Sequence, residues 1–131
     1  MEKWQTIADE RHFNIARSDD VIRVVRSSQP FDTLREILEV HRALVARLDA
    51  VDRAALGLLY DLRDAQGRND PAFESAIAPI RPRIWAEWGR ISVLVRTAIG
   101  AMQIRRHLAE DGIRASVFTD DAEAAAHLQR S

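Results

Sequence analysis

The chain has 131 residues, with 19 basic and 20 acidic side chains and a formal net charge of −1. This length is typical of a single domain with a real core, and the balanced charge favours neither nucleic acid nor an anionic membrane as a partner. Cysteine is absent, which excludes disulfides, thiol catalysis and thiolate metal sites. No apolar run approaches the roughly 20 residues of a membrane span, and residues 1–11 lack the apolar segment of a signal peptide. We therefore expect a cytoplasmic protein, and the preference for arginine over lysine suggests a GC-rich bacterial source.

The amino-terminal part predicts a β-hairpin. Two runs of β-branched and aromatic residues between Phe13 and Val25 flank the polar segment 17–20, whose short side chains suit a tight turn. Residues 1–11 are ambiguous, because Trp4 and Ile7 would fit either an additional strand or a loose tail.

A helix over residues 32–49 and a buried strand over residues 56–62 are predicted next. Thr33 and Glu36 have the spacing of a capping box, and apolar residues follow at helical spacing. The nearly continuous apolar character of residues 56–62 is typical of a central strand that is covered on both faces.

Pro71 suits the first turn of a second helix, in which Pro79 and Pro82 should introduce a kink or a split. The apolar stripe of this helix consists of Phe73, Ile77, Ile80, Ile84 and Trp88.

The carboxyl-terminal third repeats the order of strand and helix. Strands are predicted over residues 91–95 and 115–118, and between them a helix over residues 98–110 that Gly112 can terminate. A short final helix should extend to about residue 129.

The predicted order is therefore ββαβαβαβα. It implies an α/β fold in which a mixed central sheet of about five strands packs against helices. We expect one domain over residues 12–131, preceded by the amino-terminal segment 1–11.

The most distinctive segment is the run from Gly57 to Glu74, in which the central strand leads into a charged loop and then into a helix. Open α/β sheets often bind ligands and partners at such a joint. The charged side chains could hold the loop together as a network, or recognise a charged partner through bidentate arginine pairing. The candidate partner-binding residues of this run are Asp61, Arg63, Asp64, Arg68, Asn69, Asp70 and Glu74.

Arg96 and Thr97 follow the neighbouring strand and precede a helix, where free N–H groups and the helix dipole favour an anion. Thr97 could equally be a simple helix cap. If the two strands run parallel, both residues converge with the Asp61 loop at one edge of the sheet. The combined patch is a better candidate than either part alone.

Three short stretches, together with the element order, resemble the STAS-like fold and in particular the bacterial anti-sigma factor antagonist-like family. The stretches are Leu58-Leu59-Tyr60-Asp61-Leu62-Arg63, Asn69-Asp70-Pro71-Ala72-Phe73-Glu74 and Val117-Phe118-Thr119-Asp120-Asp121-Ala122-Glu123-Ala124. The resemblance covers residues 12 to 129 and implies a non-enzymatic interaction domain of bacterial regulation. Its partner would be another protein, bound by the loop after the central strand and by the next helix.

The antagonists of this family carry a phosphorylated serine in an Asp-Ser-x-Gly step at the start of that helix. The corresponding stretch here is Asn69-Asp70-Pro71-Ala72, which has no hydroxyl group. Ser75 is the nearest hydroxyl and lies inside the predicted helix. We therefore expect binding without a phosphoserine switch.

No catalytic or metal-binding motif is recognisable. A nucleophile paired with a base is not evident, and the four histidines are dispersed, so we expect neither catalysis nor a cofactor nor a metal. His41 lies on the apolar stripe of the first helix, as a core histidine would.

The position of Trp85 remains open from the sequence. Trp85 could emerge beside Pro82 as a protein interface, for example in a homodimer, or it could pack at the kink or on the amino-terminal segment.

Two other functions also remain open. The chain could be a carrier or sensor of a small, apolar or lipid-like ligand, bound between the sheet and the kinked helix. An enzyme that uses the arginine and aspartate patch is a third reading.

Overall fold

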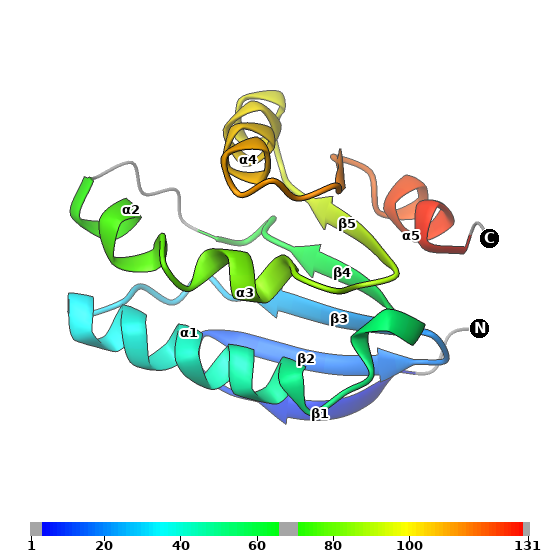
Figure 1. The fold of residues 1–131 in the computed structure, drawn as a ribbon, viewed down its shortest axis with the longest axis horizontal. Coiled ribbons are helices and arrows are strands. Elements are labelled where there is room, and N and C mark those ends of the chain that lie inside the picture. The colour runs from blue at the N-terminus through cyan, green and yellow to red at the C-terminus, as the bar shows by residue number, and fades with distance from the viewer. Residues whose placement is uncertain (1–3, 66–70, 130–131) are drawn as a thin grey trace.

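The computed structural model describes residues 4–65 and 71–129, which form an α/β fold with a six-stranded mixed sheet (Figure 1). The strands are β1 (Gln5–Asp9), β2 (Phe13–Ser18), β3 (Val21–Arg26), β4 (Gly57–Asp61), β5 (Arg90–Leu94) and β6 (Ser116–Phe118). The helices are α1 (Leu34–Asp49), α2 (Pro71–Ile77), α3 (Arg81–Trp85), α4 (Ala98–Glu110) and α5 (Asp121–Gln129), with a 3-10 turn, η1 (Arg53–Ala55), before β4.

The strands lie in the sheet in the same order as in the sequence. β1, β2 and β3 are antiparallel, whereas β3 to β6 are parallel. The mixed sheet predicted from the sequence is thus confirmed, with six strands rather than about five. The additional strand is β1, which pairs with β2. The amino-terminal segment therefore contributes a strand and is not a loose tail.

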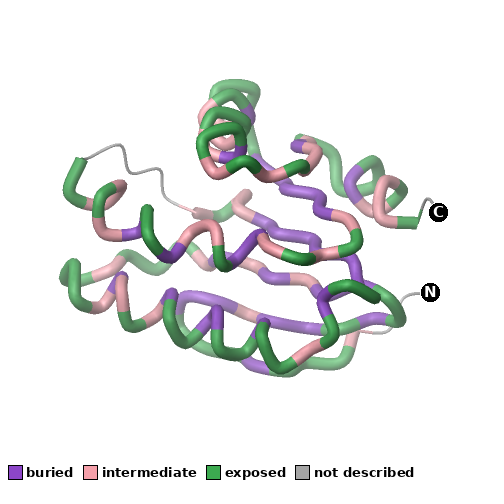
Figure 2. The backbone as a smooth tube through the Cα atoms, viewed as in Figure 1, coloured by how far each residue is buried: buried purple, intermediate pink, exposed green. Residues whose placement is uncertain are grey.

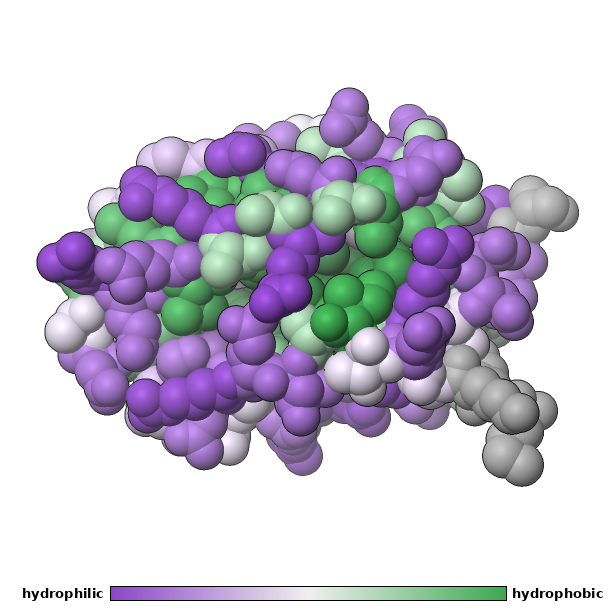
Figure 3. Space-filling model, turned by 90° about the horizontal axis from the view of Figure 1, so that it is seen from below, coloured by the Kyte–Doolittle hydropathy of each residue, from purple (hydrophilic) through white to green (hydrophobic). Residues whose placement is uncertain are grey.

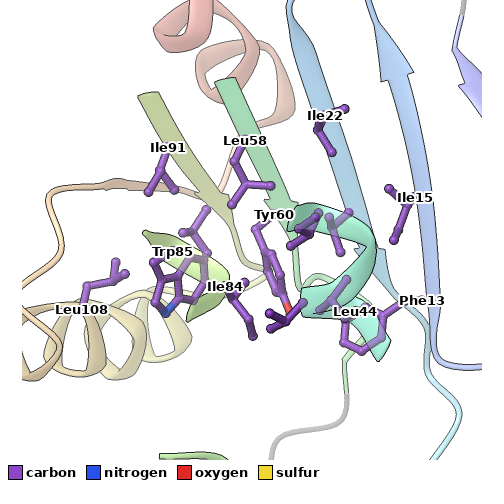
Figure 4. Close-up of a cluster of buried hydrophobic side chains, with 14 of the residues drawn as sticks. Phe13, Ile15, Ile22, Leu44, Leu58, Tyr60, Ile84, Trp85, Ile91 and Leu108 are labelled. Atoms are coloured by element: carbon purple, nitrogen blue, oxygen red, sulfur yellow. The ribbon is translucent and has the colours of Figure 1, made fainter. Parts of the chain in front are cut away.

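The helices that connect the parallel strands cover one face of the sheet. Parallel crossovers are right-handed, so strands added in one direction place all their connecting helices on the same side. The main core lies between this face and the helices, where the central strands are largely buried (Figure 2). Ile22 and Leu58 are fully buried there (Figure 4), as is Val93. Aromatic contacts extend the core, since the rings of Tyr60 and Trp85 lie 4.9 Å apart.

Helix caps fix the ends of α1 and α4 where the sequence indicated. The Thr33 hydroxyl accepts a hydrogen bond from the Glu36 amide at 3.0 Å, and the Glu36 carboxylate accepts one from the Asp32 amide at 2.8 Å. This arrangement satisfies amides that the first turn of α1 leaves without partners. Gly112, with φ of 68°, follows the end of α4 in the left-handed conformation that favours glycine.

The proline-containing helix is split into α2 and α3, as the sequence predicted. A buried arginine stabilises the end of α3: Arg53 donates to the carbonyl oxygens of Arg83 at 2.7 Å and Ala86 at 3.0 Å, and to Asp49 at 2.7 Å. At the start of α3, Arg81 makes a bidentate ion pair with Asp111 at 2.6 and 2.9 Å.

On the opposite face of the sheet, α5 is the one helix that the structure describes. It packs on β4, β5 and β6, and Trp4 also packs against this face. Leu59 and Leu94 from the sheet pack there with Ala124 of the helix. The same face of β3 and its neighbours extends beyond α5, and this incomplete coverage leaves room for a groove.

An apolar hollow of about 320 Å³ lies between α1 and the part of the sheet near β2. Figure 3 shows apolar side chains gathered along the middle of one side of the molecule and bordered by hydrophilic ones.

None of the helices in residues 4–65 and 71–129 is long and apolar enough to cross a membrane.

Candidate functional site

The end of β4 carries a buried carboxylate that an arginine of the following turn binds in a bidentate manner. Asp61 is 6% exposed. Arg63 donates to it from Nε at 3.1 Å and from Nη2 at 2.8 Å, and the backbone amide of Arg63 donates to the same carboxylate at 3.0 Å. These hydrogen bonds raise the pKa of the Arg63 guanidinium. Asp61 and Arg63 therefore hold the chain where it leaves the sheet.

Arg96 joins this turn from the end of the neighbouring strand. Its Nε donates to the carbonyl oxygen of Arg63 at 2.8 Å, and its Nη2 donates to the Asp64 carboxylate at 2.9 Å. β4 and β5 are parallel and adjacent, so their carboxyl ends lie at one edge of the sheet. The structure thus brings Asp61, Arg63, Asp64 and Arg96 together in the network that was one of the two interpretations of the sequence.

The remaining candidates do not all belong to this network. The Thr97 hydroxyl accepts from the Gly100 amide at 3.0 Å and so acts as the cap of α4. Glu74 points from α2 toward α4, with Arg106 at 3.6 Å and His107 at 3.5 Å. Arg68, Asn69 and Asp70 lie outside the described residues.

Trp85 corrects one expectation, because it is 5% exposed and packs in the core rather than at the surface. The sequence spacing had placed it about 100° from Ile84 on a long helix. α3 has only five residues, and its orientation is set by the packing of both side chains into the core. The alternative of a tryptophan packed at the kink is the one that the structure shows.

An open groove of about 890 Å³ adjoins the network on the face of the sheet that α5 leaves partly uncovered. Its floor is formed by alternate residues of β3 and β4, and its borders by the β2–β3 turn, α5 and Trp4. The lining residues are Trp4, Ser18, Asp19, Asp20, Val21, Arg23, Val25, Leu59, Asp61, Arg63, Asp64, Asp121, Ala125, Leu128 and Gln129.

Arg23 lies in the floor of this groove, and sequence reasoning missed it. Its guanidinium stacks on Trp4, with 4.3 Å between Cζ and the ring centroid, and its buried Nε has no hydrogen-bond partner among the described residues. A buried donor without a partner is unusual in a native protein. The signal in the sequence was the alternation of Val21, Arg23 and Val25, which places a charge in the middle of one strand face and argues against complete coverage of that face.

The groove is predominantly acidic. Of the described residues that line it, five are aspartates and two are arginines, which leaves a formal excess of three negative charges among them. Asp61 and Asp64 are paired with arginines, whereas Asp19, Asp20 and Asp121 make no ion pair with another described residue. These three carboxylates remain able to interact with basic groups of a partner.

The histidines do not contribute to this surface. His41 is buried in α1, where Nδ1 lies 2.7 Å from the carbonyl oxygen of Ile37. Burial lowers its pKa to about 4, so the ring is neutral at pH 7. In the described part of the chain, no three histidine, aspartate or glutamate side chains are grouped so that they could hold a metal ion.

Comparison with known proteins adds no further identification. No protein-family model matches the sequence, and comparison with curated proteins and with solved structures finds no significant match.

Proposed function

We propose that the chain is a non-enzymatic protein-interaction domain of the STAS-like, anti-sigma factor antagonist-like kind, and that it acts in bacterial regulation. The observation that carries this proposal is the half-covered sheet face. Its groove combines carboxylates that form no ion pair within the described part of the chain with an arginine, Arg23, whose buried Nε has no partner there. A folded chain gains little from keeping such groups uncovered, whereas a partner segment in the groove would satisfy them.

The charge of the groove indicates the chemistry of the partner. A segment rich in lysine or arginine would pair with Asp19, Asp20 and Asp121, and its backbone carbonyl oxygens would accept from Arg23. Opposite charges across an interface mainly raise the association rate and the specificity. We therefore propose a partner with a basic binding segment.

The network at the end of β4 has a supporting role in this proposal. Asp61, Arg63, Asp64 and Arg96 largely satisfy one another, so they contribute less to affinity than unpaired groups would. Their role is to hold the border of the groove in one conformation before binding, which lowers the ordering cost of association.

The proposed interaction does not use a phosphoserine switch. The resemblance places that switch at Asn69-Asp70-Pro71-Ala72, which contains no serine, threonine or tyrosine. Regulation would then depend on the amounts of the two partners, or on a change in the partner itself.

Affinity capture from the native host with reversed groove charges tests this function. We expect Asp121→Arg to abolish recovery of a specific partner that the wild-type chain retains, because it places a positive charge against a basic segment. Asp52→Arg is the matched control, since this aspartate is exposed but lies outside the groove. Equal recovery by both variants would exclude the groove as the binding surface.

A second candidate function, binding of a small ligand, is favoured by a cavity of about 510 Å³ on the helix-covered face. The cavity is lined by Phe73 of α2 and by residues of α1, α4 and the sheet. Its volume lies within the usual range for small-molecule sites. Native mass spectrometry of the purified protein would detect a retained ligand as a discrete mass increase that disappears under denaturing conditions.

A further inference from the structure

The 510 Å³ cavity contains a buried positive charge at the carboxyl end of β3. Arg26 is 8% exposed and lines the cavity together with the aromatic rings of Phe13, Phe31 and Phe73. The carboxyl ends of parallel strands are the usual edge for ligand sites in α/β sheets. Both the position and the lining are therefore those of a binding site.

Arg26 has no acidic partner within ion-pairing distance among the described residues. Its Nη1 donates to the carbonyl oxygen and the hydroxyl of Ser27, the next residue in the chain. Its Nε and Nη2 form no hydrogen bond within the described part of the structure. This edge of the guanidinium carries the two parallel N–H donors that match the two oxygens of a carboxylate.

The other polar groups around Arg26 carry no compensating charge. Burial raises the pKa of the Tyr60 hydroxyl and lowers that of His41 to about 4, so both are neutral at pH 7. Burial also lowers the pKa of Arg26 itself, but a guanidinium stays protonated in proteins. Among the residues that the structure describes, the Arg26 guanidinium thus has no counter-charge, and a buried cation without one is costly in a medium of low dielectric constant.

Aromatic rings offset part of this cost and provide the apolar walls. The Arg26 guanidinium lies 4.4 Å from the ring centroid of Phe31 and 5.8 Å from that of Phe13. Such contacts stabilise a cation, but they do not supply the hydrogen-bond acceptors that Nε and Nη2 lack.

We infer that this cavity binds a small organic carboxylate with an aromatic or branched apolar body, whose carboxylate pairs with Nε and Nη2 of Arg26. The body would pack against Phe31 and Phe73. This inference deepens the second candidate function and does not depend on the partner groove, which lies on the opposite face of the sheet.

Titration calorimetry with phenylacetate and its uncharged analogue 2-phenylethanol tests the inference. We expect the wild-type chain to bind phenylacetate at least tenfold more tightly than the alcohol. Arg26→Gln should remove this preference, because glutamine keeps polar donors but not the charge or the fork geometry. Arg42→Gln is the matched control: it removes an exposed arginine of α1 that does not line the cavity, and it should leave the affinity unchanged.

The possible results distinguish a failure of the carboxylate assignment from a failure of the small-ligand function. Equal binding of acid and alcohol would leave the small-ligand function standing and overturn the carboxylate assignment. No binding of phenylacetate, benzoate or 3-phenylpropanoate at millimolar concentration would overturn the inference, as would binding that Arg26→Gln leaves intact. If the Arg26→Gln variant does not fold, nuclear magnetic resonance of the wild-type chain decides: shifts confined to Phe31, Tyr60 and Phe73 support the cavity, and their absence contradicts it.

Discussion

Arg96 binds the Asp64 carboxylate at 2.9 Å and the carbonyl oxygen of Arg63 at 2.8 Å, and so ties the turn after β4 to the end of β5. The two strands are neighbours in the sheet, but 32 residues separate Arg96 from Asp64 in the sequence. These two hydrogen bonds hold the turn at the border of the groove.

Removal of this connection should alter the groove more than the fold. We expect Arg96→Ala to change the free energy of unfolding by less than about 1 kcal/mol, because exposed ion pairs contribute little to stability. Partner recovery should fall nonetheless, since the turn that bears Asp64 is no longer held. Urea unfolding and affinity capture measure the two effects, and Arg35→Ala, which removes another exposed ion pair on α1, should affect neither.

The buried Arg53 makes a stronger contribution, because it lies in η1 and binds both the end of α1 and the end of α3. We expect Arg53→Met to lower the free energy of unfolding by roughly 3 kcal/mol, since the substitution leaves buried carbonyl oxygens without donors. Arg83→Met is the control, because that side chain is exposed and its distance to Asp49 is 3.7 Å. Similar unfolding midpoints for both variants would contradict the assigned role of Arg53.

Asp111 should be critical for the attachment of α3 to α4. Its side chain is 7% exposed and accepts two hydrogen bonds from Arg81. We expect Asp111→Asn to cost roughly 3 kcal/mol, because it removes the charge of the bidentate partner of a largely buried guanidinium and leaves only the exposed Glu110 nearby. Glu110→Gln provides the comparison: Glu110 lies 3.6 Å from the same arginine but is exposed, and its loss should cost less than about 1 kcal/mol. Thermal unfolding of the two variants would distinguish these values.

The elements of the fold could be predicted largely from local signals. The caps at Thr33 and Thr97, the left-handed Gly112 and the split between the prolines all depend on residues close in sequence. Strand order depends instead on long-range packing, so the sequence did not reveal that a single helix covers one face of the sheet. Arg23 was missed for this reason, because its neighbours in the groove come from other elements.

The candidate site was predictable where two parallel strands end side by side, and not elsewhere. The contact between Arg96 and Asp64 was predictable, because adjacent parallel strands place the loops after them at one edge of the sheet. Glu74 lies apart from them: α2 lies on the helix-covered face, where this carboxylate is 3.6 Å from Arg106. Trp85 was ambiguous because its orientation depends on how the short α3 packs, which helical spacing alone does not determine.

The pH dependence of stability should reflect the buried His41. Its pKa is lowered to about 4 in the folded chain, against about 6.5 in an unfolded chain. Between these values the unfolded state binds more protons than the folded state, so stability rises with pH and is lost as the pH falls from 6.5 toward 4. Between pH 6.5 and pH 5 this group should account for about 2 kcal/mol of lost stability.

Urea unfolding of the wild-type chain and of His41→Leu across this range would measure the contribution. Leucine cannot take up a proton and suits the apolar surroundings of the ring, so the variant should lose about 2 kcal/mol less than the wild type over this interval. Parallel curves for the wild type and His41→Leu would show that His41 is protonated as easily in the folded chain as in the unfolded one.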